Sequence, residues 1–60
     1  MAYKDFLIAE DVAKITGYSL SKAGNIIRAL NNELKEKGFV TFRGKISKEY
    51  LQERLNIIID

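Results

Sequence analysis

The residue types that usually do chemistry in proteins are scarce in this sequence. Among its 60 residues there is no Cys and no His, which excludes a disulfide, a zinc site built on nitrogen or sulfur ligands, and catalysis by either side chain. The carboxylates form no recognisable metal-binding loop, and the four glycines form no phosphate-binding run. We therefore expect a protein that is not an enzyme and has no cofactor and no small-molecule substrate.

The charged residues that remain favour a polyanionic partner. Between Val12 and Lys48, eight basic residues stand against two acidic ones, a net charge of +6, whereas residues 1–11 and 49–60 each carry a net charge of −2. A basic centre between acidic ends is typical of a surface that binds nucleic acid. On charge alone, a solvated helix face explains the pattern equally well.

Polar side chains recur at positions 21, 25, 28, 32 and 35, which is the spacing of one helix face. Asn25 can pair with adenine and Arg28 with guanine, each through two hydrogen bonds, and Lys22 lies beside them. Asn25 and Arg28 are our candidates for contacts at or near the bases of duplex DNA, and Lys22 is a further DNA-binding candidate. The alternative for them is simple solvent exposure.

Two further groups suit the phosphate backbone of DNA. Ser19 and Ser21 stand at the expected start of this helix, where free backbone N–H groups attract anions, although Ser19 also suits a plain helix cap. Arg43, Gly44 and Lys45 would reach phosphates or the adjacent minor groove. For these three, an ordinary charged hairpin tip is the alternative.

Two helices separated by a short turn must position these side chains. Apolar residues at positions 8, 12 and 15 predict a first helix of about two turns that ends at Gly17. Ser19 is the expected N-cap of a second helix over residues 20–37, ended by Gly38, with a buried face made of Leu20, Ala23, Ile27, Leu30 and Leu34. Gly24 inside this helix costs about 1 kcal/mol relative to Ala, which close packing on the first helix explains better than close approach of DNA.

A hairpin and a third helix complete the expected order of elements. Residues 39–42 predict a strand, Arg43 and Gly44 a tight turn, and residues 45–46 the returning strand. Ser47 is the expected N-cap of a helix that runs to the chain end. The apolar tail at residues 57–59 either completes the core or joins a partner subunit, and four other large side chains are assigned to the core: Phe39, Phe42, Tyr50 and Leu51.

The order and spacing of these elements resemble a known family, over residues 7–55. Residues 9–19 (AEDVAKITGYS) are similar to its first helix and turn, residues 21–28 to its recognition helix, and residues 45–51 to the strand that leads into its last helix. The family is that of the small excisionase-type and MerR-like proteins of phages, integrative elements and bacterial regulators. The resemblance implies a mainly α fold with a small β-hairpin, a winged helix-turn-helix, whose second helix enters the major groove of DNA.

We therefore predict a single winged helix-turn-helix domain over residues 1–60 that binds double-stranded DNA sequence-specifically. It would serve as an excisionase-like architectural factor or as a small transcriptional regulator. The expected partners are duplex DNA, further copies in a homodimer or cooperative oligomer on DNA, and an integrase. With no signal peptide and no membrane span expected, we predict a cytoplasmic protein. The alternative function is a protein-interaction module, such as a small phage protein that inhibits a host factor, without DNA binding.

Overall fold

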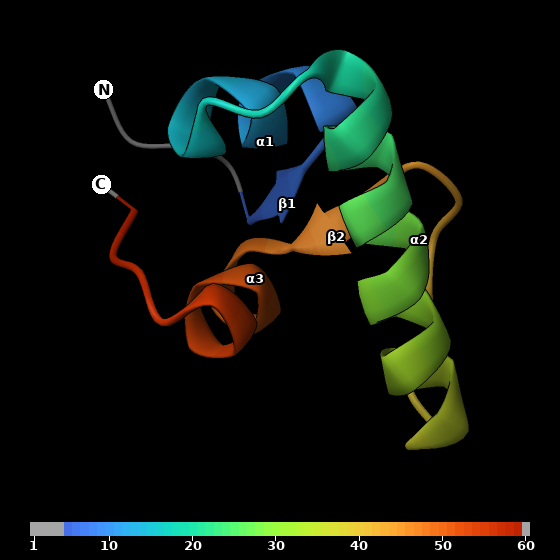
Figure 1. Cartoon of the computed structure of the whole chain (residues 1–60). Helices are drawn as coiled ribbons and strands as arrows, with labels where there is room; N and C mark the ends of the chain where they lie inside the picture. The colour runs from blue at the N-terminus through green and yellow to red at the C-terminus, as the bar shows by residue number, and fades with distance from the viewer. Residues whose placement is uncertain (1–4, 60) are drawn as a thin grey trace.

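The computed structural model describes residues 5–59 as a mainly helical chain with one small antiparallel sheet. The elements follow in the order β1 (Phe6–Leu7), α1 (Ala9–Thr16), α2 (Leu20–Glu36), β2 (Ile46–Ser47) and α3 (Lys48–Leu55). In Figure 1 the two strands lie at the centre, between α1 and α3, and the long helix α2 runs along one side. None of the helices in residues 5–59 has the length and apolar character that crossing a membrane requires.

The predicted hairpin is wrong, because β2 pairs with a strand from the other end of the chain. Residues 39–42 form no strand, and β2 instead lies antiparallel to β1, with Leu7 opposite Ile46. Both of these side chains are fully buried, whereas Phe39 and Val40 are 61% and 82% exposed. Pairing β2 with β1 therefore places two large apolar side chains in the core, which a strand over residues 39–42 does not do.

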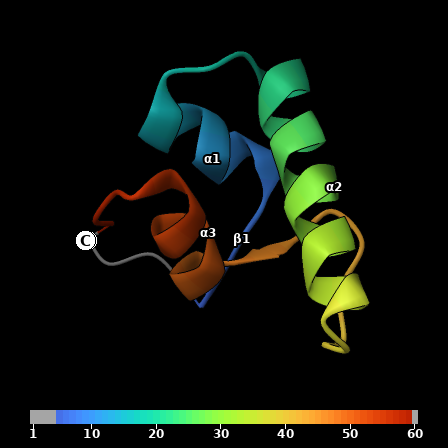
Figure 2. The ribbon, with the colours of Figure 1, turned by 60° about the horizontal axis from the view of Figure 1, so that its bottom comes forward.

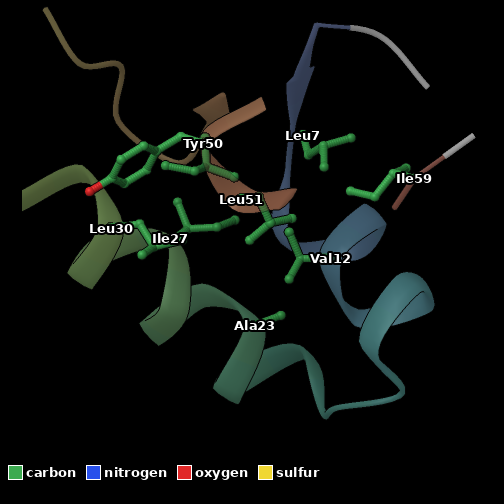
Figure 3. Packing of buried hydrophobic residues seen from close by; sticks show 9 residues of the cluster. Leu7, Val12, Ala23, Ile27, Leu30, Tyr50, Leu51 and Ile59 are labelled. Atoms are coloured by element: carbon green, nitrogen blue, oxygen red, sulfur yellow. The ribbon is translucent and has the colours of Figure 1, made fainter. Parts of the chain in front are cut away.

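The hydrophobic core draws on every helix and both strands. Figure 3 shows side chains from these elements converging between α2 and the sheet. The buried residues are Leu7, Val12, Ala23, Ile27, Leu30, Ile46, Tyr50, Leu51 and Ile59. The expected burial of Tyr50 and Leu51 is confirmed.

Three residues that are expected in the core are exposed instead. Phe39 is 61%, Phe42 52% and Leu20 56% exposed. The two phenylalanines belong to the segment that forms no strand and lies outside the core, where the Phe42 ring packs edge-on against Phe6 with 5.6 Å between ring centroids. Leu20 is the first residue of α2, beyond the part of the helix that the core covers.

The predicted boundaries of α1 and α2 are largely confirmed. Gly17 ends α1 with φ at +78°, and its N–H donates to the carbonyl oxygen of Ala13 at 2.8 Å. The Ser19 hydroxyl accepts a hydrogen bond from the Lys22 N–H at 3.2 Å, which makes Ser19 the N-cap of α2. At its other end α2 stops at Glu36, one residue earlier than expected.

Helix α3 starts where expected but ends well before the chain does. Ser47 caps it by accepting a hydrogen bond from the Tyr50 N–H at 3.3 Å. The helix ends at Leu55, and the following chain turns back so that the Ile59 N–H donates to Oε1 of Gln52 at 2.7 Å. Ile59 is buried and Ile57 is partly buried against the core, whereas Ile58 is 91% exposed, so the apolar tail completes the core through two of its three side chains.

Candidate nucleic-acid interface

An open groove runs between the polar face of α2 and the loop over residues 38–45. Figures 1 and 2 both show this loop doubling back beside α2 before it enters β2. The α2–loop groove, as we call it, has a volume of about 670 Å³ and is lined by Leu20, Ser21, Gly24, Asn25, Ile27, Arg28, Asn31, Asn32, Lys35, Thr41, Phe42, Arg43 and Gly44. Three of these lining residues are basic and none is acidic, so the groove presents positive charge and amide groups to a ligand.

Five of the eight residues singled out in the sequence lie together in this groove. Ser21, Asn25 and Arg28 come from the first turns of α2, and Arg43 and Gly44 come from the loop. The side chains of Ser21, Asn25, Arg28 and Arg43 are all exposed. The fold thus brings the two predicted binding segments to one surface, although they are about 15 residues apart along the chain.

The other three candidates lie outside the groove lining. Ser19 is engaged as the cap of α2. The ammonium group of Lys22 lies 4.1 Å from the centroid of the Tyr18 ring, a cation–π contact that directs it toward the turn before α2. Lys45 has an exposed side chain, while its backbone takes part in the turn at the end of the loop. Ser19 and Lys22 therefore lie at the start of α2, and Lys45 lies at the end of the loop.

Gly24 is on the groove lining and not on the packed face of α2, which overturns the expectation that it packs on the first helix. A Cβ atom built on Gly24 would meet no heavy atom of the protein outside the helix backbone within 4 Å. The small residue on the buried face of α2 is its neighbour Ala23, which is fully buried in the core cluster that includes Val12. Packing inside the protein thus gives no reason for a glycine at position 24.

Asn31, which is not among the eight residues expected at the site, ties the loop to α2. Its Nδ2 donates to the carbonyl oxygen of Phe42 at 3.1 Å and to that of Lys45 at 2.8 Å. The Lys45 N–H donates to the same Phe42 carbonyl at 3.2 Å, and Gly44 has φ at +77°, a pattern that fits a type II turn with glycine at its third residue. A signal was available: Asn31 falls between buried Leu30 and the polar stripe, where a short amide can reach neighbouring backbone.

The sequence of this chain is similar to that of a known excisionase. The ICEBs1 excisionase of Bacillus subtilis (strain 168) is 41% identical to this chain over 49 residues, which cover 82% of this chain and 77% of that protein. The chain belongs to the excisionase family. No family model matches it, and no solved structure matches it. The excisionase-type resemblance seen in the sequence is thereby confirmed.

In this excisionase-type protein Glu33, one of the two acidic residues near the C-terminal end of α2, is engaged away from the groove. The Glu33 carboxylate is held by the Arg54 guanidinium through two hydrogen bonds, from Nε at 2.7 Å and Nη2 at 3.0 Å, and by the Tyr50 hydroxyl at 2.6 Å. The bonds from Arg54 first, and then the bond from Tyr50, lower the pKa of Glu33 from 4.5 to about 2. The carboxylate thus joins α2 to α3, and its charge is matched by Arg54 on the side of α2 that does not line the groove.

Proposed function

We propose that this chain is a recombination directionality factor of a mobile element and that it binds double-stranded DNA through the α2–loop groove. Two observations support the proposal: the excisionase relative, and a surface that gathers Arg28, Lys35 and Arg43 without an acidic lining residue. The single observation that carries the binding site is this charge pattern on the groove. Basic side chains in a binding surface neutralise DNA phosphates, and this neutralisation supplies much of the affinity for DNA.

In this proposal α2 lies in the major groove of the duplex as a recognition helix. The 17 residues of α2 extend over about 25 Å, and the major groove of B-DNA is about 12 Å wide and admits one helix. Asn25 and Arg28 then face base edges, where Asn pairs with adenine and Arg with guanine. Ser19, Ser21 and Lys22 at the start of α2 contact phosphates, which fix the position of the helix without reading sequence.

The 38–45 loop takes the role of a wing without being a hairpin. Helix α1, the turn at residues 17–19 and α2 correspond in order to a helix-turn-helix, and the loop returns along α2. Arg43, Gly44 and Lys45 then reach the phosphates or the minor groove beside the segment that α2 reads. The two-residue strand β2 leads this wing back into the core through Ile46.

Close approach of DNA is the remaining explanation for Gly24. Its position in the groove lining lies between Leu20 and Arg28, which are one turn away on either side along the same face of α2. Without a Cβ atom, the helix surface is recessed there, so a sugar–phosphate strand or a thymine methyl group can come closer to the backbone.

The partners in this proposal are duplex DNA, further copies of the chain and an integrase. One module of 60 residues contacts few base pairs, so binding by a homodimer or by cooperative neighbours is expected on a full site. Apolar side chains of the loop that do not line the groove, including Phe39 and Val40, are exposed and are available to a protein partner. An architectural factor would bend the DNA, whereas a transcriptional regulator would protect a promoter.

A salt titration with duplex DNA tests the proposal. Duplexes selected by the chain from a random pool should bind with a log affinity that falls against log salt with a slope of about −3.6 if about four phosphates are neutralised. A chain that selects no duplex, or whose binding does not respond to salt, would contradict DNA binding and favour the protein-interaction alternative. Gel mobility of circularly permuted duplexes then separates bending from simple occupancy of a promoter.

A further inference from the structure

Asn31 lines the groove, but its side-chain amide donates its hydrogen bonds to the backbone of the loop. Both of its partners, the carbonyl oxygens of Phe42 and Lys45, are acceptors, so only the NH₂ of the amide can face them. The two carbonyls belong to the first and last residues of the turn that contains Arg43 and Gly44. One side chain of α2 therefore holds this turn at both of its ends.

Little else fixes the turn relative to α2. Within residues 5–59, the side-chain hydrogen bonds between the loop and α2 are the two that Asn31 makes. Phe39 and Val40 are mostly exposed, and the Phe42 ring contacts Phe6 of β1 and is itself 52% exposed. The start of the loop is joined to α2 by the Phe39 N–H, which donates to the Leu34 carbonyl at 3.0 Å, and its end is followed by buried Ile46. Between these two ends, the bonds from Asn31 are what join the turn itself to the helix among the described residues.

We propose that Asn31 is a positioning residue of the DNA interface: it sets where Arg43 and Lys45 lie relative to Asn25 and Arg28. This inference rests on the proposed DNA-binding function. A wing that is already placed for DNA loses less conformational freedom on binding than one that must be ordered at that moment. Removal of the Asn31 amide lowers the fraction of molecules in which the loop is placed for DNA binding, and the apparent affinity for DNA falls in proportion to that fraction.

A double-mutant cycle separates positioning from direct contact with DNA. Asn31→Ala should weaken binding to the selected duplex roughly three- to tenfold. In a background that carries Arg43→Ala and Lys45→Ala it should cause no further loss, because the loop then has no basic side chain to position. Asn32→Ala is the matched control, since it removes the same amide from the next residue of α2, which lines the groove but makes no bond to the loop, and its effect should be equal in both backgrounds.

A second measurement follows the loop in the absence of DNA. Hydrogen exchange at the Lys45 N–H should become faster in Asn31→Ala, and also in Asn31→Asp, which keeps the size of the side chain but replaces the donor with an acceptor. The rate in Asn32→Ala should match that of the unaltered chain. Unfolding curves of each variant show whether a loss of affinity comes from a loss of fold.

The outcomes are distinguishable. Unchanged Lys45 exchange or unchanged affinity in Asn31→Ala would overturn the inference, and so would an equal loss of affinity with and without the basic side chains of the loop, which indicates a direct DNA contact by Asn31. If the unaltered chain binds no duplex, the proposed function fails and the DNA role of Asn31 fails with it. Faster Lys45 exchange together with a loss confined to the intact loop is the result that supports positioning.

Discussion

Replacement of Gly24 by alanine should make the protein more stable and a weaker DNA binder. Position 24 is in the interior of α2, its φ is not in the left-handed region, and no heavy atom outside the helix backbone lies within 4 Å of the added methyl group. Alanine is favoured over glycine there by about 0.5–1 kcal/mol, which for a domain of this size raises the melting temperature by about 2–8 °C. The gain arises mainly from the lower conformational entropy of the unfolded chain, while the packing of the folded protein stays as it is.

The same methyl group projects into the α2–loop groove and should keep DNA away from the helix. If the backbone of α2 is in contact with the duplex at Gly24, the overlap costs about 1 kcal/mol or more, and the affinity falls by about fivefold at least. Thermal unfolding followed by circular dichroism measures the stability, and fluorescence anisotropy with the selected duplex measures the affinity. The two quantities should change in opposite directions.

Ala29→Gly is the matched control for this prediction. Ala29 is exposed on the same helix and does not line the groove, so the reverse exchange should lower the melting temperature by a similar amount and leave the affinity unchanged. A Gly24→Ala protein that is more stable and binds the duplex as tightly as before would refute close approach of DNA. A less stable Gly24→Ala protein would show that the space at position 24 is not open.

Three further predictions concern stability and sequence discrimination. The pKa of Glu33 is lower in the folded chain than in the unfolded chain, so the stabilisation by the Glu33 carboxylate should be complete above about pH 4.5 and disappear as the pH falls to about 2. Unfolding curves of Glu33→Gln and of the unaltered chain should therefore converge as the pH is lowered over this range. Ile59→Ala should destabilise the fold by about 2 kcal/mol in urea unfolding while Ile58→Ala stays within about 0.5 kcal/mol, and equal losses would contradict the position of the tail. Arg28→Ala should reduce discrimination between the selected duplex and random DNA by about tenfold, whereas Lys45→Ala should weaken binding to the selected duplex and to random DNA equally. Similar behaviour of the two variants would disprove that Arg28 reads bases while Lys45 contacts phosphates.

The family and most of the helical organisation could be predicted from the sequence because the signals for them are local. The turn at Gly17 and the cap at Ser19 depend on bonds within three or four residues, and both are present in the structure. The buried and polar faces of α2 follow in the same way from the helical repeat, apart from its first residue, Leu20. The polar stripe with Asn25 and Arg28 was therefore visible before any tertiary contact was known.

The partner of β2 could not be predicted from local signals. An aromatic and β-branched run at residues 39–42 followed by an Arg-Gly turn has the pattern of a hairpin, but strand pairing is selected by what it buries. Leu7 is nearly 40 residues from Ile46 along the chain and becomes its neighbour only in the folded core. The segment left without a strand then became the exposed loop.

Sequence by itself determined that this chain has no Cys and no His, that its middle is basic, and that a helix with one polar face follows a short helix and a turn. Composition and helical periodicity are properties of the chain alone, so no fold is needed to see them. Tertiary structure alone decided that Gly24 faces open space, that Glu33 is paired with Arg54 on α3, and that Asn31 holds the loop beside α2. Each of these depends on which distant segments the burial of apolar surface brings together, and that choice is made by the whole core at once.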